Sequence, residues 1–224
     1  MVAFALSGCM SGATSHHVNA FPEHKKWSIG WGMEGGRNYK DVWEPEDESP
    51  VIPAEPLNVS FAPNPRLQLG IGVIGTGLGL HGKAVVGHEG NWAGALAGTF
   101  GFLGGDDSDP WDNAPTWKAF GWYAVTSAIL SVSTPRPVAP GRKDILVTLS
   151  FGPRLVLCDL SYEQLNSGDT WDGLVADYGA FIGAGLERWF FEITGELSIL
   201  RVDRPSRGTR EVSPFGGVQL HFSW

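Results

Sequence analysis

The sequence predicts an all-β protein, an eight-stranded antiparallel up-and-down barrel that crosses a membrane. Apolar and polar residues alternate with a period of two over several segments, which places successive side chains on opposite faces of a strand. No run approaches the roughly 18 apolar residues that a spanning helix needs, and strands can cross hydrocarbon only as a closed barrel. Glycine (31 residues) and tryptophan (10) are abundant, while charged residues make up only 18% of the chain. This composition is typical of a barrel wall that meets lipid.

The 224 residues are enough for one domain with a full core. We expect residues 26 to 224 to form the barrel and residues 1 to 25 to form a signal remnant and a flexible tether. The net charge of -8 and the pI near 5.2 argue against a nucleic-acid partner, because phosphate binding needs clustered Lys and Arg. The sequence indicates no cofactor.

The eight predicted strands differ in how clearly they alternate. The clearest are those in which apolar side chains face outward, against Thr, Ser, Glu or Gln on the inward face, at 145–152, 191–199 and 218–224. Within the second strand, a phase slip predicts a bulge at Val73-Ile74, and His81-Gly82-Lys83 is predicted to be a tight return. The strands span approximately 26–34, 66–80, 84–103, 116–132, 145–152, 175–186, 189–200 and 216–224.

The connections between these strands are predicted to alternate in length. Residues 37–65, 104–115, 159–172 and 201–214 are polar or rich in proline and are predicted to be long loops, and the three remaining connections are predicted to be short. Outer-membrane barrels have short periplasmic turns and longer external loops. With an even number of strands, the pattern therefore predicts that the first strand begins and the last strand ends on the periplasmic side, where the tether also lies.

The N-terminus carries a cysteine among small residues. Leu6-Ser7-Gly8-Cys9 resembles the lipobox of bacterial lipoproteins, and the resemblance implies that Cys9 is lipidated and becomes the mature N-terminus. The apolar stretch before it is short and lacks a basic start, so a truncated export signal is the alternative. Lipidation would exclude a disulfide with Cys158, and we expect none.

The last nine residues, Gly216 to Trp224, resemble the C-terminal signal that the barrel-assembly machinery recognises. The alternating positions that carry this assembly signal are Val218, Leu220, Phe222 and Trp224; the final residue in that family is most often Phe. Residues 26 to 224 resemble the small eight-stranded barrels of the OmpA and OmpX type. The resemblance implies the cell outer membrane of a Gram-negative bacterium. It implies outer-membrane lipid, lipopolysaccharide, the assembly machinery or another envelope protein as partners, but no particular activity.

Charged residues at inward positions are predicted to pair inside the lumen. Because side chains fill an eight-stranded interior, we expect a structural plug, with gated conduction as the alternative. The predicted lumen charge network consists of Glu34, Arg66, Arg154, Glu192 and Glu196.

An acidic cluster in the second long loop has oxygen ligands at spacings that permit Ca²⁺ binding. No closing Glu completes an EF-hand, so a solvated loop is the alternative. The cluster consists of Asp106, Asp107, Asp109 and Asp112.

These observations favour a structural or surface-interaction component of the outer membrane, with external loops as the binding surface. A lipid A-modifying enzyme is one alternative: His221 and Ser223 share a face beside Glu192 and Glu196, the residue types of a nucleophile, base and acid set. They are predicted to point inward, and the chain lacks the His-x-Ser-Asn segment of the lipid A deacylases, so catalysis is not expected. A soluble lipocalin-like binding barrel, with apolar residues inward, is the second alternative.

Overall fold

The computed structural model describes residues 9–11, 19–22, 24–38, 52–54, 57–74, 77–106, 117–135, 145–165, 167–204 and 209–224. The regular structure of these residues is β throughout, and they form no helix long and apolar enough to cross a membrane. The strands are β1 (Cys9–Ser11), β2 (Trp27–Asn38), β3 (Ile52–Ala54), β4 (Leu57–Asn64), β5 (Leu67–Ile74), β6 (Gly77–Glu89), β7 (Trp92–Asp106), β8 (Trp117–Ser133), β9 (Leu146–Gln164), β10 (Asp169–Arg188), β11 (Phe191–Arg204) and β12 (Thr209–Ser223).

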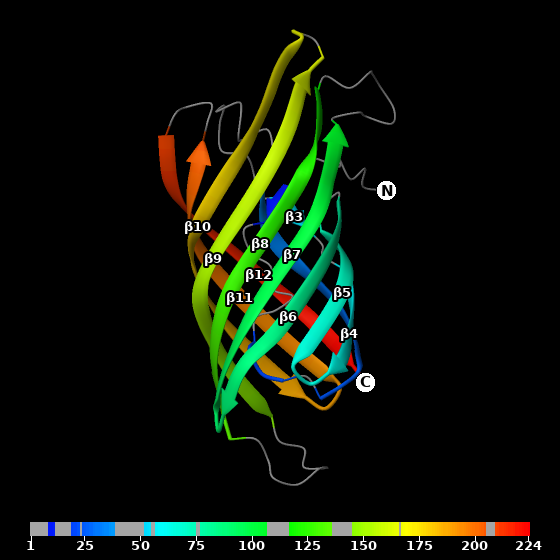
Figure 1. Cartoon of the computed structure of the whole chain (residues 1–224), viewed down its shortest axis with the longest axis vertical. Helices are drawn as coiled ribbons and strands as arrows, with labels where there is room; N and C mark the ends of the chain where they lie inside the picture. Colours follow the sequence, from blue (N-terminus) through cyan, green and yellow to red (C-terminus); the bar gives the residue numbers. More distant parts are fainter. Residues whose placement is uncertain are drawn as a thin grey trace.

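Ten of the described strands close into an antiparallel barrel (Figure 1). Each strand from β4 to β12 pairs with the next along the chain, and β2 pairs with both β12 and β4, which joins the two edges. At this seam Trp27 and Trp224 exchange two backbone hydrogen bonds of 3.1 and 2.9 Å. We call the end that holds Trp27 and Trp224 the C-terminal end, and the opposite end the distal end. The short strands β1 and β3 both pair with β2 at Gly36, toward the distal end.

The predicted antiparallel all-β barrel is confirmed, but the predicted number of eight strands is wrong. One missed strand, β4, lies within residues 37–65, which their prolines marked as a loop. Leu57, Val59 and Phe61 face outward and pair with both β2 and β5. Pro63 falls where the pairing with β5 shifts register after Phe61, so the missing N–H of proline does not interrupt the central ladder.

The other missed strand arose because the two predicted strands 66–80 and 84–103 are three strands, β5, β6 and β7. Residues 66–80 contain the hairpin of β5 and β6, in which Ile74 pairs with Gly77. The phase slip that predicted a bulge at Val73-Ile74 therefore marks a turn, since a short connection and a bulge shift the alternation alike. His81 and Lys83, predicted to be in a return, lie inside β6 and are 5% and 3% exposed.

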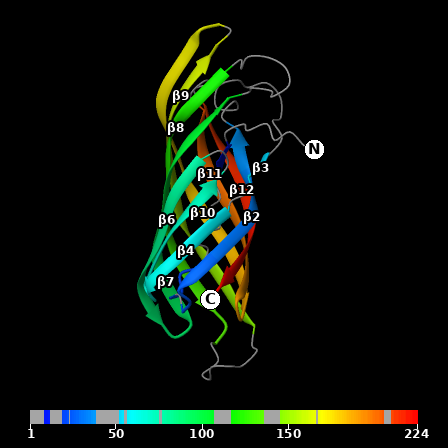
Figure 2. The ribbon, with the colours of Figure 1, turned by 90° about the vertical axis from the view of Figure 1, so that its right-hand side faces the viewer.

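Several strands run beyond their predicted limits. β9 continues to Gln164 and β10 begins at Asp169, so most of the predicted loop 159–172 is strand. Figures 1 and 2 show that this hairpin projects past the other strands at the distal end. The predicted alternation of long and short connections is also wrong, because residues 134–145, at the C-terminal end, separate β8 from β9 by more residues than separate β9 from β10. The exposed side chains at the ends of β9 and β10 include Ser161, Glu163 and Asp172, so these strand ends lack an apolar face and resemble a loop in sequence.

The outward side chains form an apolar band, and the predicted facing is confirmed where it was clearest. Val147, Leu149 and Phe151 are 41%, 53% and 46% exposed, whereas Thr148 and Ser150 are buried. None of the described outward side chains in the middle of the barrel wall is charged. The face that a water-soluble barrel would make polar is therefore apolar here.

Aromatic side chains lie at both edges of this band. Trp92 and Phe102 both face outward on β7. The ten residue steps from one to the other span about 25 Å along the axis of a barrel with a rise of about 3.3 Å per residue and a tilt near 40°. At the C-terminal level Trp27 contacts Phe61, with ring centroids 4.8 Å apart, and at the distal level Phe100 stacks on Trp122 at 6.0 Å. The two levels are thus separated by about the height of the apolar band of outer-membrane barrels.

Candidate functional site

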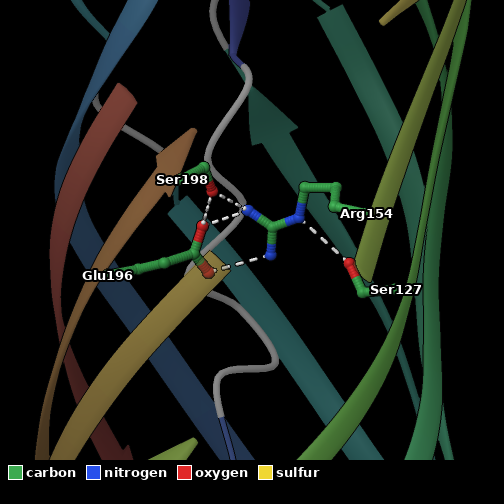
Figure 3. A network of polar contacts seen from close by, with 4 residues as sticks. All are labelled: Ser127, Arg154, Glu196 and Ser198. Carbon is green, nitrogen blue, oxygen red and sulfur yellow. Dashed lines mark hydrogen bonds and ion pairs between the residues drawn. The ribbon is translucent and has the colours of Figure 1, made fainter. Parts of the chain in front are cut away.

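The most developed polar site among the described residues is a buried ion pair in the lumen (Figure 3). Arg154 on β9 and Glu196 on β11 lie on either side of β10, and their side chains are 1% and 0% exposed. The strand between them pairs Gly179 with Arg154 and Gly183 with Glu196. Because glycine has no side chain, Arg154 and Glu196 can reach one another across β10.

The ion pair is bidentate and its remaining polar atoms are also bonded. Arg154 Nη2 donates to Glu196 Oε2 at 2.9 Å, and Arg154 Nη1 donates to Glu196 Oε1 and, at 2.7 Å, to Ser198 Oγ. Arg154 Nε donates to Ser127 Oγ at 3.0 Å, and Ser198 Oγ donates to Glu196 Oε1 at 2.8 Å. A buried charge pair repays its desolvation only with such complete hydrogen bonding. The network therefore joins β8, β9 and β11 along the inner face of one side of the barrel wall.

Phe181 connects this network to a second group of residues that fills the lumen. The guanidinium of Arg154 lies over the Phe181 ring, 4.6 Å from its centroid. Phe181 also belongs to an apolar cluster that contains Ala20 and Phe21, two residues of the segment that the sequence assigned to a flexible tether. Residues 19–22 thus lie inside the barrel, between the ion pair and the C-terminal end.

The predicted charge network is brought together only in part. Arg154 and Glu196 form the pair described above, whereas Glu192 accepts a hydrogen bond of 2.8 Å from Asn19 Nδ2. Arg66 is exposed in the turn between β4 and β5, at the C-terminal end, so it does not join the network. The backbone of Glu34 pairs with Gly217, and its side chain lies outside the described residues.

The residues proposed for the enzyme alternative lie at the C-terminal end of the lumen. Glu192 and His221 are directly paired across β11 and β12, and His221 is 8% exposed. Its ring and the Asn58 amide occupy the space left by Gly30 of β2. Ser223 is the position paired with Ser28. These side chains face the lumen and not the outer surface that a lipid acyl chain would reach, so the arrangement does not present a lipid-facing catalytic set.

The remaining predicted sites lie near the barrel ends. The backbone of Cys9 pairs with Asn38 in β1 and β2, at the distal end, whereas the sequence placed the tether at the end where β2 begins. Of the acidic cluster, Asp106 ends β7 and its side chain is not described; the other three residues, Asp107, Asp109 and Asp112, lie outside the described residues. Elsewhere, the described residues contain no group of three potential metal ligands.

Val218, Phe222 and Trp224, at the proposed assembly signal, face outward on β12 or directly after it, and Leu220 is half-buried. The outward facing of these alternating positions agrees with the alternation in the sequence.

Sequence reasoning missed the residues that hold residues 19–22. The sequence predicts a tight return at Lys83 and a flexible tether at Phe21. A usable signal was present, because Phe21 is the one Phe, Trp or Tyr between residues 10 and 26. An isolated aromatic residue in a polar segment is a candidate for insertion into a neighbouring core.

The fold and the site define a class: a closed ten-stranded antiparallel barrel with an apolar outer face and a polar, filled interior. No protein-family model matches the chain, and no curated protein matches it.

Proposed function

We propose that this protein is an integral barrel of the outer membrane with a structural or surface-interaction role, and that its distal strand ends and loops bind the partner. The uncharged outward band between two aromatic levels carries the proposal. Its height of about 25 Å corresponds to the apolar band of outer-membrane barrels, and Trp and Tyr are enriched where such a wall meets the lipid headgroups.

The facing of the side chains argues against the soluble lipocalin-like alternative. A lipocalin-like barrel keeps apolar side chains inside and polar ones in water. Here Leu78, Leu80 and Ile182 are 72%, 62% and 59% exposed, whereas Ser198 and Gln219 are fully buried. In water such a continuous apolar surface would aggregate.

Charged residues near the distal level support lipid and lipopolysaccharide as the surroundings of the barrel. Arg201 faces outward and its guanidinium lies 5.9 Å from the ring centroid of Tyr178, an aromatic residue of the distal level. Lys118 and Arg210 are likewise exposed on β8 and β12. Cations at this height are placed to meet the phosphates of lipid headgroups.

The filled lumen favours a structural or interaction role over transport. The Arg154 and Glu196 side chains neutralise one another across β10, and the segment 19–22 occupies the lumen below them. A partner would therefore meet the distal end, where the β9–β10 hairpin projects furthest (Figure 2).

The first test of the proposal is localisation combined with heat-modifiable mobility. We expect the protein in the outer-membrane fraction, and we expect boiled and unboiled samples to migrate differently on a detergent gel. A protein that is recovered in the soluble fraction and does not shift would refute the proposal and restore the lipocalin-like alternative.

A sharper test places one charge in the band. Leu96 faces outward on β7 between Trp92 and Phe102 and is 56% exposed. Leu96→Arg should destabilise the barrel by about 2–4 kcal/mol, the cost of Arg near the bilayer midplane, measured by urea unfolding in lipid vesicles. Thr170→Arg is the matched control, because Thr170 is exposed on β10, beyond the band, and pairs with Glu163 rather than with a cation. If the two variants are equally stable, the band does not face lipid.

Lipidation of Cys9 remains part of the proposal and has a separate test. Intact-mass measurement of the membrane-extracted protein should show a mature N-terminus at Cys9 carrying acyl groups, and Cys9→Ala should abolish this modification. An unmodified Cys9 would remove the lipoprotein assignment and leave the barrel assignment unaffected.

A further inference from the structure

The segment Asn19–Pro22 is more deeply buried than its sequence suggests. Ala20 is 0% exposed and Phe21 is 2% exposed, although neither belongs to a strand. They share an apolar cluster with side chains of β7, β8 and β10. Chain without regular structure is normally at a protein surface, so its position inside the lumen calls for specific contacts.

Three strands on different sides of the lumen supply these contacts. Glu192 of β11 accepts a hydrogen bond from Asn19 Nδ2 at 2.8 Å, and Ser131 Oγ of β8 accepts one from the Ala20 N–H at 2.9 Å. Lys83 Nζ of β6 donates to the Phe21 carbonyl oxygen at 3.2 Å. Two of the three bonds involve main-chain groups of the segment, which is how proteins recognise peptides.

The wall also has a recess for the Phe21 side chain. β7 presents Ala93 and Ala95 at successive inward positions, each 2% exposed, with Ala97 packed against the same cluster. Ile129 and Phe181 complete the cluster. The His88 ring meets Phe21 edge-on, with centroids 5.7 Å apart and planes at 80°. Small residues in a row leave the room that an aromatic ring requires.

The strand number explains why such a recess exists. Eight strands enclose an interior that side chains can fill, and barrel diameter grows with the number of strands. A ten-stranded barrel therefore has space beyond its own inward side chains, and here the segment 19–22 occupies part of it.

We propose that the lumen near the C-terminal end is a peptide-binding site whose resident ligand is the chain's own Asn19–Phe21, and that this segment keeps the lumen closed. The ligand class is a short peptide with a polar side chain, a small residue and an aromatic residue in succession. The peptide site stands on the contacts above; closure of a membrane pore rests in addition on the proposed function.

The experiment compares full-length variants in planar lipid bilayers. Phe21→Asp places a carboxylate in the apolar recess and should release the segment. We expect the wild type to be closed. For Phe21→Asp we expect the ionic conductance to rise by about tenfold or more, because a tenfold fall in the closed-to-open ratio raises the open fraction of a mostly closed channel by about tenfold. Lys26→Asp, a carboxylate at an exposed position directly before β2 and outside the segment, should stay closed, and so should the conservative Phe21→Leu. Heat-modifiable mobility verifies that each variant is folded.

In the second part of the experiment, the proposed ligand is added to the variant channel as a peptide in solution. A synthetic peptide of residues 15–25 should close the Phe21→Asp channel, and the same peptide with Phe21→Asp should not. A folded Phe21→Asp variant that stays closed would overturn the plug, and so would a wild type that conducts equally. A channel that both peptides block equally, or that neither blocks, would overturn the peptide site.

Two further measurements keep the outcome decisive. If Phe21→Asp does not fold, Lys83→Met removes the contact to the Phe21 carbonyl and should itself open the lumen; a folded, closed Lys83→Met would count against the plug. If the protein fails to insert into bilayers, the proposed membrane function fails, but fluorescence anisotropy of the labelled peptide on the Phe21→Asp variant still tests the binding site. Phe21-dependent binding would support the site, and its absence would refute it.

Discussion

The lumen is filled in two different ways along its length. In its middle, side chains fixed in β9 and β11 meet in a buried ion pair (Figure 3). Toward the C-terminal end, the irregular segment 19–22 is held by single hydrogen bonds and an apolar recess. The ion pair cannot separate unless strands move, whereas the segment can leave without breaking a pairing between barrel strands. We therefore expect the first to determine the stability of the barrel and the second to determine access to its interior.

The largest effect should come from breaking the ion pair. Glu196→Gln leaves the Arg154 guanidinium buried without its counter-charge and should lower the free energy of unfolding by about 3–5 kcal/mol. Urea unfolding in detergent micelles, followed by tryptophan fluorescence, measures it. The double variant Arg154→Met with Glu196→Met should recover much of this loss, because an apolar pair of similar volume leaves no uncompensated charge. A double variant less stable than Glu196→Gln would contradict this account.

A smaller effect should come from the packing of the same wall. A methyl group at Gly79 of β6 would lie 2.6 Å from the Tyr123 hydroxyl, the one contact under 3.0 Å at that position. Gly79→Ala should therefore cost about 1–3 kcal/mol through overpacking. Tyr123→Phe removes the hydroxyl, so in the double variant the two losses should be less than additive.

The control for Gly79→Ala is Gly94→Ala on β7, whose added methyl group would meet its nearest neighbour at an ordinary 3.5 Å. We expect almost no change for this control. Equal losses at Gly79 and Gly94 would indicate backbone effects rather than the clash with Tyr123.

The smallest effect on global stability should come from weakening the contacts of residues 19–22 in the lumen. Ser131→Ala removes the acceptor for the Ala20 N–H and also the 2.7 Å hydrogen bond between Ser131 Oγ and Ser150 Oγ. Because the segment can open locally and the bond to Ser150 is one neutral pair, we expect the unfolding free energy to fall by about 1 kcal/mol, while hydrogen exchange of the Ala20 amide accelerates about tenfold. Ser133→Ala, at another buried inward serine of β8, should leave that amide protected. If Ser131→Ala destabilises the barrel as much as Glu196→Gln, the ion pair and residues 19–22 do not differ in their effect on stability, contrary to the proposal.

The sequence by itself determined the all-β class and the facing of the clearest strands. In residues 145–152 the alternation separates Val147 and Leu149 from Thr148 and Ser150, and the structure places them on opposite faces. Such a pattern is local, because successive side chains of any strand point to opposite sides. Because the pattern is local, it predicted that the interior is polar but not which inward side chains bond to one another.

The tertiary structure decided the number of strands and the filling of the lumen. β4 is a strand because β2 and β5 supply hydrogen-bond partners on both sides, and its local sequence, between prolines, does not show this. Arg154 meets Glu196, 42 residues away, only because both cross the inward face of β10. Phe21 is buried because closing ten strands leaves room inside. These are non-local contacts, and the pattern of one segment contains no information about which distant segment will lie beside it.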